Sequence, residues 1–453
     1  MPSRAYLIDR AGADDVLQLA VDRGRVPMAI GALLVLDPMA RPAADAVRSA
    51  LLQRSADVPR LGQRLVRTAP GAGRPVWADA GPGASADLVD EVTVEAGVGQ
   101  QALLDATAEL VTTRLGLDRP LWRARLLLDA DGGVAGIALV AHHVLADGLG
   151  GLAVLAALAD DDTSGWGGAR PSTARPRAPA SLPGWGVLAR DTWGSRLRGL
   201  GGLRGLRALS ASARRVGAGA GELGLRRPQL ADRCSLLGRT GDRRRLVVAT
   251  ADLAVVAGSA RAHGASVNDV VVTAVTGALV ELLARRGESV GELVVSVPIS
   301  RRRQGDAAAL GNSTGVVPVR VPAVPDAATR LSALVAERGR VRSPGRGGSA
   351  AVLTPVFRGL AAVGAFQVFV DHQRLVHTFV TNVRGPTQRM RVAGAEVAEV
   401  VPVAVNPGNV TVSFDVLSYA GSLVVTLVHD PALLPEAAWL AERVTAGLAA
   451  SAS

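Results

Sequence analysis

A pair of histidines followed by an Asp-Gly step constrains this chain more than any other feature. His142 and His143 follow an apolar run of strand length (134–140), and Asp147 and Gly148 begin a run of helical length. Such a strand-to-helix junction places polar side chains at the edge of a hydrophobic core, where a substrate can reach them. Since histidine titrates near neutral pH, the junction predicts a proton-transfer site.

The length of the chain predicts more than one hydrophobic core. It has 453 residues, whereas a single core rarely serves more than roughly 250–300 residues. Strand-like and helix-like segments mix without strict alternation in both halves, which indicates a layered α/β sandwich. Between the halves, Pro, Gly, Ser and Arg dominate the composition. We therefore expect an N-terminal subdomain (1–160), an interdomain linker (161–245) and a C-terminal subdomain (246–453).

The positive charge of the chain does not by itself indicate a nucleic-acid partner. The formal charge is +10, but the sequence holds no lysine, so all 50 basic residues are arginine. Part of this excess fits a compositional bias that also gives abundant alanine and glycine. Aromatic residues make up only 3% of the chain and do not alternate with the arginines, so stacking on bases is not expected.

The cysteine and histidine contents limit redox and metal chemistry. Cys234 is the single cysteine, which excludes an intramolecular disulfide and fits a reducing compartment. His142 and His143 are adjacent, and His372 and His377 are spaced for different faces of a helix, so no metal site is expected. The first residues are too charged for a signal peptide, and no apolar window is long enough for a membrane span. We expect a cytoplasmic protein, either free or peripheral at a membrane.

Short motifs follow one another over nearly the whole chain. They are Pro120-Leu121-Trp122, His142 to Gly148, Asn268-Asp269, Val297 to Arg302, Gly311-Asn312, Asn382 to Pro386 and Ser418-Tyr419. In this order the chain resembles the bacterial wax ester synthase/diacylglycerol acyltransferase family, a branch of the CoA-dependent acyltransferases with the HHxxxDG motif. Arg384 departs from the family, which usually has proline there, and the added charge leaves the choice of acyl acceptor open.

The resemblance implies a fold and a reaction. The fold would be two chloramphenicol-acetyltransferase-like subdomains with the active site in a tunnel between them. The enzyme would move a fatty acyl group from acyl-CoA to a long-chain alcohol or diacylglycerol, giving a wax ester or triacylglycerol. No cofactor is expected, because acyl-CoA is a substrate.

Acyl transfer to an alcohol requires a base, since an alcohol is a weak nucleophile at neutral pH. His143 is the candidate general base and would return the proton to the departing CoA thiolate. His142 points to the other face if the strand continues, so we expect it to support the loop. Asp147 would either orient His143, as in a catalytic triad, or have a structural role. The resemblance implies the structural role, in which Asp147 pairs with Arg302. Gly148 would let the chain turn sharply.

The second half is expected to contribute further contacts. Asn268 follows Ser266, which is placed to cap a helix, so Asn268 would either stabilise an oxyanion or only shape the helix start. Asn382 is a weaker candidate of the same kind. Ser296 lacks a base beside it in the sequence, so we assign it to substrate binding together with Gly148 and Asn382. Structural roles are assigned to the motif residues Arg302, Pro120, Trp122 and Asp269.

Two other functions are compatible with these residues. One is an acyltransferase that acylates a specialised metabolite or takes its acyl group from a carrier-protein thioester. The other is a non-catalytic lipid-binding protein of the same fold, although such a protein would have no need of His143. Within the linker, leucines and arginines over 193–216 would suit a helix at a membrane or lipid-droplet surface, or a linker packed on its own protein.

Overall fold

The computed structural model describes most of the chain. The described ranges are 8–81, 83–85, 87–94, 99–160, 183–200, 230–300, 314–341, 357, 359–360, 363–405 and 408–450. Arg302, Gly311 and Asn312 of the predicted motifs lie outside these ranges, as does most of segment 193–216.

The first half of the chain supplies most of a six-stranded sheet with the order β11-β12-β1-β6-β5-β4. Its strands are β1 (Ala29–Leu36), β4 (Val89–Thr93), β5 (Trp122–Leu128), β6 (Val134–His142), β11 (Arg391–Val392) and β12 (Ala395–Ala404). The central strands β1 and β6 pair antiparallel, with Leu33 opposite Ala138. Both strands are buried along most of their length, which explains why their sequences are unbroken apolar runs.

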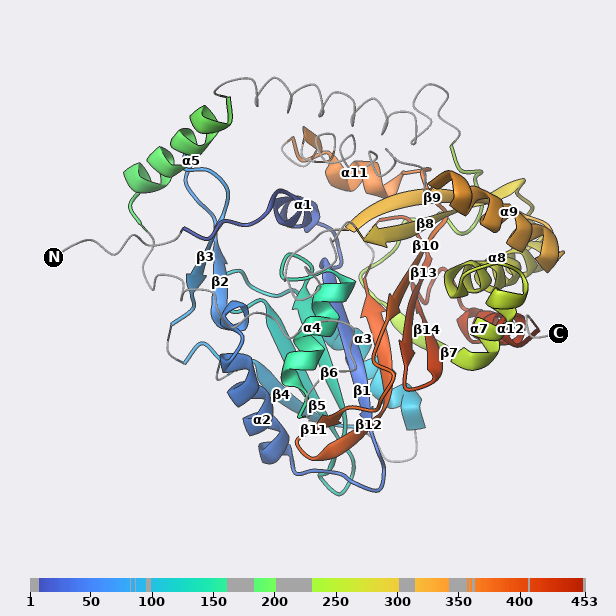
Figure 1. Cartoon of the computed structure of the whole chain (residues 1–453), viewed down its shortest axis with the longest axis horizontal. Coiled ribbons are helices and arrows are strands. Elements are labelled where there is room, and N and C mark those ends of the chain that lie inside the picture. Colours follow the sequence, from blue (N-terminus) through green and yellow to red (C-terminus); the bar gives the residue numbers. More distant parts are fainter. Residues whose placement is uncertain are drawn as a thin grey trace.

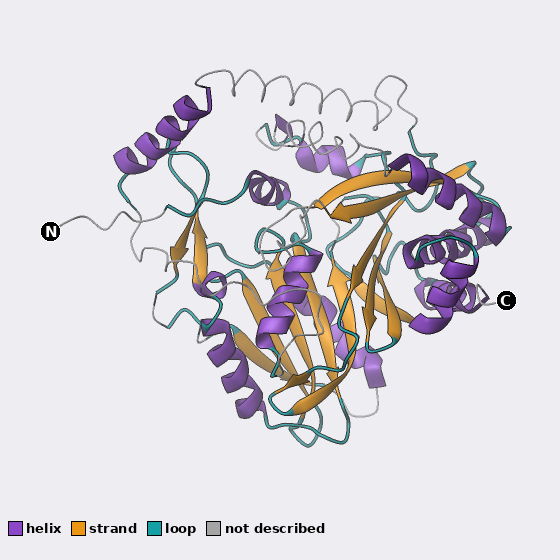
Figure 2. Cartoon of the chain, viewed as in Figure 1, coloured by secondary structure: helices purple, strands orange, loops and turns teal. Residues whose placement is uncertain are grey.

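The second half builds another six-stranded sheet with the order β7-β14-β13-β10-β8-β9. Its strands are β7 (Arg245–Asp252), β8 (Glu292–Ser300), β9 (Thr314–Pro322), β10 (Thr378–Arg384), β13 (Val412–Tyr419) and β14 (Ser422–His429). The strand β10 runs parallel to β13, with Thr381 beside Asp415, whereas β13 and β14 are antiparallel. The two sheets lie side by side at the centre of the molecule, with helices packed around them (Figure 2).

Helices cover the sheets and divide the hydrophobic core into layers. In the first half they are α1 (Ala13–Val21), α2 (Ala44–Ala56), α3 (Gly99–Thr112) and α4 (Gly148–Leu158). In the second half they are α7 (Leu253–Ala262), α8 (Val267–Arg285), α9 (Ala327–Val341), α11 (Phe366–Asp371) and α12 (Ala437–Ala450). The helices α7, α8, α9 and α12 gather on one side of the second sheet (Figure 1). In contrast, α3 packs in a cluster with strands of both sheets, so it joins the two halves.

The strand β12 crosses from the second half of the chain into the first sheet. It pairs antiparallel with β1, so that Ala404 lies opposite Ile30. The expected boundary, which gave all of 246–453 to the C-terminal subdomain, therefore misses this crossover: 391–404 complete the first sheet. Burial explains the exchange, since β12 covers the free edge of β1 with a paired, largely buried strand.

The helix α8 forms the centre of the second core. Ser266 caps it as expected: Ser266 Oγ accepts from the Asp269 N–H, and the Asp269 carboxylate accepts from the Ser266 N–H over 2.7 Å. By length and composition α8 is apolar enough to cross a membrane, but 72% of that window is buried inside the protein. Its apolar character is that of a core helix.

A smaller structural unit flanks the first sheet. It consists of a short hairpin, β2 (Gln63–Val66) with β3 (Val76–Asp79), and the helix α5 (Trp185–Leu200). The helix α5 lies at the periphery, beside this hairpin and apart from both large sheets (Figure 1). It belongs to the segment expected to be a linker, and the structure shows that part of this segment is helical.

Candidate active site

A cavity of about 290 Å³ lies between the two halves of the molecule, close to the lower limit of small-molecule sites. The first half lines it with β1, β6 and α4, and the second half with β8, β10, β12 and β13. Most of its wall is apolar and includes Ile30, Leu139, Leu152, Val403 and Leu417. The two halves therefore meet at one binding space that suits an extended apolar ligand.

The junction after β6 delivers one histidine of the pair to this cavity. The strand ends at His142, and consecutive side chains of a strand point to opposite faces. His143 is half-buried and lines the cavity, whereas His142 is 2% exposed and points away from the described wall. The His143 N–H donates to the Met28 carbonyl oxygen over 2.8 Å, which fixes the backbone of the junction.

His142 is held by a buried network. Its Nδ1 accepts from the Val144 N–H over 3.0 Å, so in the neutral ring the proton resides on Nε2. That Nε2 lies 3.1 Å from Asp22 Oδ2, and Arg114 and the Met28 N–H also bind the Asp22 carboxylate. Burial alone would raise the pKa of Asp22, but the hydrogen bonds from His142 and Met28 and the charge of Arg114 lower it to about 2. His142 therefore anchors the loop that presents its neighbour.

Asp22 was not among the expected site residues. It lies 120 residues before His142, at the C-terminal end of α1, and nothing in its local sequence marks it as a partner of the motif. The structure brings the two together because the end of α1 packs beside the junction.

Asp147 begins α4. Its Oδ1 accepts from the Gly150 N–H over 3.0 Å, so the side chain caps the helix. Asp147 is 2% exposed and is also part of the cavity wall. This contact fits the structural role, while the expected pairing with Arg302 lies outside the described residues.

Gly148 is required for a reason other than the expected sharp turn. Its backbone is not in the left-handed region where glycine is favoured. Instead, a Cβ atom at this position would lie 2.9 Å from Val383 Cγ2 of β10. The close approach of the two halves at the cavity therefore selects glycine.

Two candidates from the second half lie away from the described wall of the cavity. Asn268 is in the first turn of α8, and its Oδ1 is buried without a hydrogen-bond partner in the described part of the chain. Ser296 is 3% exposed within β8, whereas Pro298 of the same strand lines the cavity. The geometry thus gives no support to Asn268 as an oxyanion donor at this cavity or to Ser296 as a substrate contact. Asp269 has the structural role expected of it, as a cap of α8.

The strand β10 brings two expected residues to the wall. Asn382 and Arg384 both line the cavity, and Arg384 is exposed at the end of the strand. The following Gly385 packs so closely on the Ser418 carbonyl oxygen that no Cβ atom would fit. Asn382 is therefore the described amide side chain that a substrate in this cavity can reach.

The Pro-Leu-Trp motif supports the site from the first half. Trp122 begins β5, lines the cavity and donates from Nε1 to the Leu61 carbonyl oxygen over 2.9 Å. Pro120 is buried just before this strand. These positions are compatible with the structural roles that were assigned to both residues.

A further polar residue of the wall, Asp415 on β13, was also missed. Thr381 Oγ1 donates to its Oδ1 over 2.8 Å, and the Ala404 N–H donates to its Oδ2 over 2.7 Å. Burial raises the pKa of Asp415 to about 7, although these two hydrogen bonds act to lower it. A sequence signal existed: the residue is the one charged side chain in the buried strand Val412–Tyr419.

Comparison with known proteins identifies the family. The model of the wax ester synthase/diacylglycerol acyltransferase catalytic domain matches residues 12–271, and that of the WS/DGAT C-terminal domain matches 310–450. A probable diacylglycerol O-acyltransferase of Mycobacterium tuberculosis is 28% identical over 438 residues, which cover 94% of this chain and 91% of that protein. A second probable diacylglycerol O-acyltransferase of this species is 28% identical and covers 75% of this chain and 76% of its own.

Solved structures agree on the fold. The wax ester synthase/diacylglycerol acyltransferase from Marinobacter aquaeolei VT8 matches with a TM-score of 0.66 at 19% identity, covering 98% of both chains. The first condensation domain of the CDA synthetase matches with a TM-score of 0.59 at 16% identity, covering 100% of this chain and 98% of its own. The expected α/β architecture is thereby confirmed. The chain belongs to the wax ester synthase/diacylglycerol acyltransferase family and is an acyltransferase.

Proposed function

We propose that this protein transfers a fatty acyl group from acyl-CoA to the hydroxyl group of diacylglycerol or a long-chain alcohol, with His143 as general base. The observation that carries the proposal is the position of His143 in the wall of an apolar cavity between the two halves. Family membership and the diacylglycerol O-acyltransferase relatives support this reaction and this class of substrates.

The chemistry follows from one histidine between an alcohol and a thioester. His143 accepts the hydroxyl proton while the oxygen attacks the thioester carbonyl carbon. When the carbon–sulfur bond breaks, the imidazolium returns that proton to the CoA thiolate, so the enzyme is regenerated. The anchored ring of His142 fixes the loop, and the cap on α4 by Asp147 fixes its other end. No cofactor is needed in this scheme.

An acyl-transfer assay tests the proposal. Purified protein would be given palmitoyl-CoA with dipalmitoylglycerol or hexadecanol, and the free CoA thiol and the ester product would both be measured. His143→Ala should lower kcat/KM by about 10²–10⁴-fold, the usual contribution of a general base. His263→Ala is the matched control, because His263 is exposed at the end of α7 and outside the described cavity wall.

The same assay separates the alternative functions. Turnover with an acyl carrier-protein thioester, together with no turnover when any acyl-CoA is the donor, would favour a carrier-dependent transferase. Binding of the lipids without turnover by any donor would favour a non-catalytic lipid-binding protein. Wild-type turnover by His143→Ala would remove His143 as the base.

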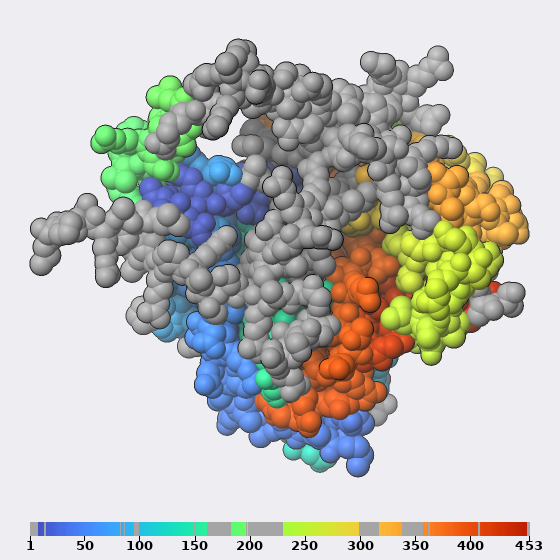
Figure 3. Space-filling view, in the orientation of Figure 1, coloured from blue at the N-terminus to red at the C-terminus, as the bar shows by residue number. Residues whose placement is uncertain are grey.

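We also propose that α5 contacts a membrane or lipid-droplet surface, from which the acceptor enters. Four large apolar side chains on this helix are exposed: Trp185, Val187, Trp193 and Leu197 are 59%, 57%, 53% and 67% exposed. The helix forms a projecting edge of the molecule (Figure 3). Exposed tryptophan and leucine on one helix are typical of an interfacial segment.

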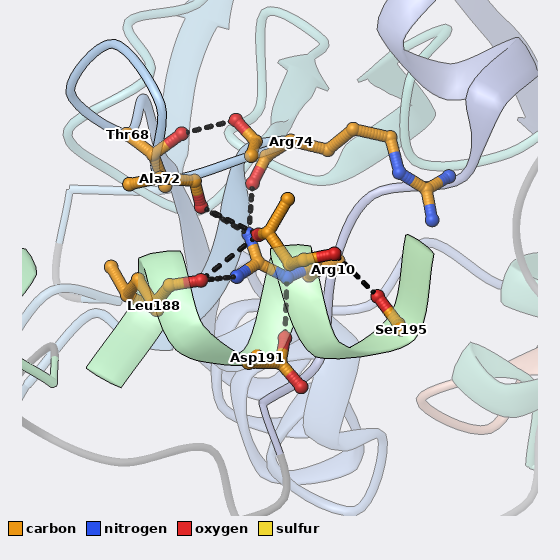
Figure 4. Close-up of polar contacts among 9 residues, drawn as sticks. Arg10, Thr68, Ala72, Arg74, Leu188, Asp191 and Ser195 are labelled. Atoms are coloured by element: carbon orange, nitrogen blue, oxygen red, sulfur yellow. Dashed lines mark hydrogen bonds and ion pairs between the residues drawn. The ribbon is translucent and has the colours of Figure 1, made fainter. Parts of the chain in front are cut away.

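A half-buried arginine, Arg10, fastens α5 to the body of the protein. Arg10 Nε donates to Asp191 Oδ2 over 3.0 Å, and its other nitrogens donate to the carbonyl oxygens of Leu188, Ala72 and Arg74, each over 2.9 Å (Figure 4). The helix is therefore held at a fixed position relative to the β2–β3 hairpin, as a surface anchor requires.

Flotation with anionic liposomes tests the anchor. The double variant Trp193→Ser with Leu197→Ser should lower the bound fraction, whereas Met39→Ser should not. Met39 is a suitable control because it is 91% exposed and lies outside α5, in the loop between β1 and α2. Equal flotation of the double variant and wild type would remove the proposal.

A further inference from the structure

Asp415 places a carboxyl group in the wall of the cavity without a charged partner. It is 2% exposed and lines the cavity. Its hydrogen bonds come from the Thr381 hydroxyl and the Ala404 N–H, both uncharged. No cation contacts Asp415 in the described part of the chain. A buried carboxyl group in such surroundings is favoured as the neutral acid.

The sheet register places Asp415 at the same end of the cavity as the histidine pair. Ala141, Ile30 and Ala404 form one row across β6, β1 and β12, and all three line the cavity. Two strand spacings separate Ala141 from Ala404, which is about 10 Å. Since Ala404 donates to Asp415, a ligand whose reacting hydroxyl meets His143 can bring a second polar group to Asp415.

A neighbouring hydroxyl group adds to the polar character of this place. Thr426 of β14 lies directly opposite Asp415 in the antiparallel register, and opposite residues share a face of the sheet. Its Oγ1 is buried without a hydrogen-bond partner in the described residues. Thr381, Asp415 and Thr426 thus form a polar row in an otherwise apolar part of the second sheet.

We propose that Asp415 is a specificity-determining residue for the acyl acceptor, which donates a hydrogen bond as a neutral acid to an ester carbonyl oxygen of diacylglycerol. The inference rests on the acyl transfer proposed above and narrows its acceptor. Both Asp415 oxygens already accept a hydrogen bond, so the acid proton needs an acceptor of its own. Diacylglycerol offers two ester carbonyl groups for it.

A simple long-chain alcohol offers nothing comparable. Its one polar group is the hydroxyl that reacts at His143, and the rest of the molecule is hydrocarbon. The Asp415 proton would then face an apolar chain, and a buried donor without an acceptor is unfavourable. Asp415 therefore discriminates between two acceptor classes that the apolar wall alone would accept equally.

The protonation state of Asp415 gives this preference a pH dependence. Burial raises the pKa of Asp415 to about 7, so the donor is present below this pH and is lost above it, where the carboxylate repels a carbonyl oxygen. Other charged or titratable side chains also face this region. Those of the described wall are Arg123, His143, Asp147 and Arg384. The neighbouring strand β14 also carries His429, which lies opposite Val412. A comparison of two ligands that differ only in their carbonyl groups cancels most of the influence of these side chains.

Equilibrium binding without acyl-CoA provides the test, because no reaction then occurs. The two ligands are 1,2-dioctanoylglycerol and its diether analogue 1,2-dioctylglycerol, which keeps the free hydroxyl and the chains but lacks both carbonyl groups. The proteins are wild type, Asp415→Asn, Asp415→Leu and the control Asp371→Asn. Asp371 is also buried, at 9% exposure, but lies outside the described wall.

Wild type should bind the diester about tenfold more tightly than the diether one unit below pH 7, and the preference should vanish one unit above. Asp415→Asn keeps a neutral donor and should retain the preference for the diester at both pH values. Asp415→Leu has no donor and should lose this preference. The control Asp371→Asn should behave as wild type. Equal binding of the two ligands by wild type, or binding of neither, overturns the inference. So does a folded Asp415→Leu variant that keeps the preference. If the protein prefers the diester but catalyses no acyl transfer, that result would count against the proposed function and not against this inference.

Discussion

Asp415 is a buried and Asp22 a half-buried carboxyl group at the site, and their surroundings shift their pKa values in opposite directions. Asp22 receives hydrogen bonds from His142 and Met28 and lies beside Arg114, and its pKa falls to about 2. Asp415 has only neutral donors, and its pKa rises to about 7. Burial acts in the same direction on both groups. The hydrogen bonds and charges around each carboxyl group therefore decide whether it serves as a fixed charge or as a neutral donor.

This difference divides the site into a scaffold side and a substrate side. The Asp22 carboxylate lies behind the histidine pair and holds the ring of His142. The Asp415 carboxyl group lies in the cavity wall itself. The free energy of unfolding and its dependence on pH should differ between the two sides.

Replacement of Asp415 should give the largest change in stability, and the change should be a gain. The folded pKa of about 7 lies above the ordinary value of 3.8, so the native state binds the proton more tightly than the unfolded state. Wild type therefore loses stability as the pH rises from about 4 to about 7, by up to about 4 kcal/mol. Asp415→Asn has no such loss and should be the more stable protein above pH 7. Urea unfolding at several pH values measures this; an equal slope in both proteins would contradict it.

Replacement of Asp22 should have the opposite sign and a smaller size. Its folded pKa of about 2 lies below the ordinary 3.8, so its contribution is present above about pH 4 and is lost as the pH falls toward 2. Asp22→Asn should cost about 2 kcal/mol at neutral pH, and the difference from wild type should shrink in acid. The same urea series provides the measurement. A constant difference across this pH range would show that charge is not what Asp22 contributes.

Replacement of Arg114 should have the smallest effect of the three. Its side chain is 44% exposed, although its nitrogen lies 2.6 Å from the Asp22 carboxylate. Water screens such a pair, so Arg114→Gln should cost at most about 1 kcal/mol. Differential scanning calorimetry against wild type measures the change. A loss as large as that of Asp22→Asn would mean that Arg114, rather than His142, is the main partner of Asp22.

Local sequence patterns predicted the parts of the site that depend on neighbours along the chain. The run before His142 forms β6, the run after Asp147 forms α4, and Ser266 caps α8 as expected. Strand alternation also predicted that His142 and His143 point to different sides. These features follow from periodicity and helix capping, which act over a few residues.

Features that depend on distant contacts could not be predicted in this way. Asp22 meets His142 across 120 residues of sequence, and β12 enters the first sheet from the second half of the chain. Gly148 was expected at a sharp turn, but Val383 of the other half is the reason for it. Asn268 begins a helix as expected, yet that helix start lies away from the described cavity wall.

The proposed mechanism makes His143 the base of an acyl transfer in the cavity between the two halves. Its most direct test is the single-turnover rate of ester formation, with wild type and His143→Ala each saturated with palmitoyl-CoA and dipalmitoylglycerol. Since both substrates are already bound, this rate reports the chemical step alone. If His143 is the base, this rate should be lower by about 10²–10⁴-fold in His143→Ala, with partial recovery on addition of imidazole. An unchanged single-turnover rate in His143→Ala would contradict this mechanism.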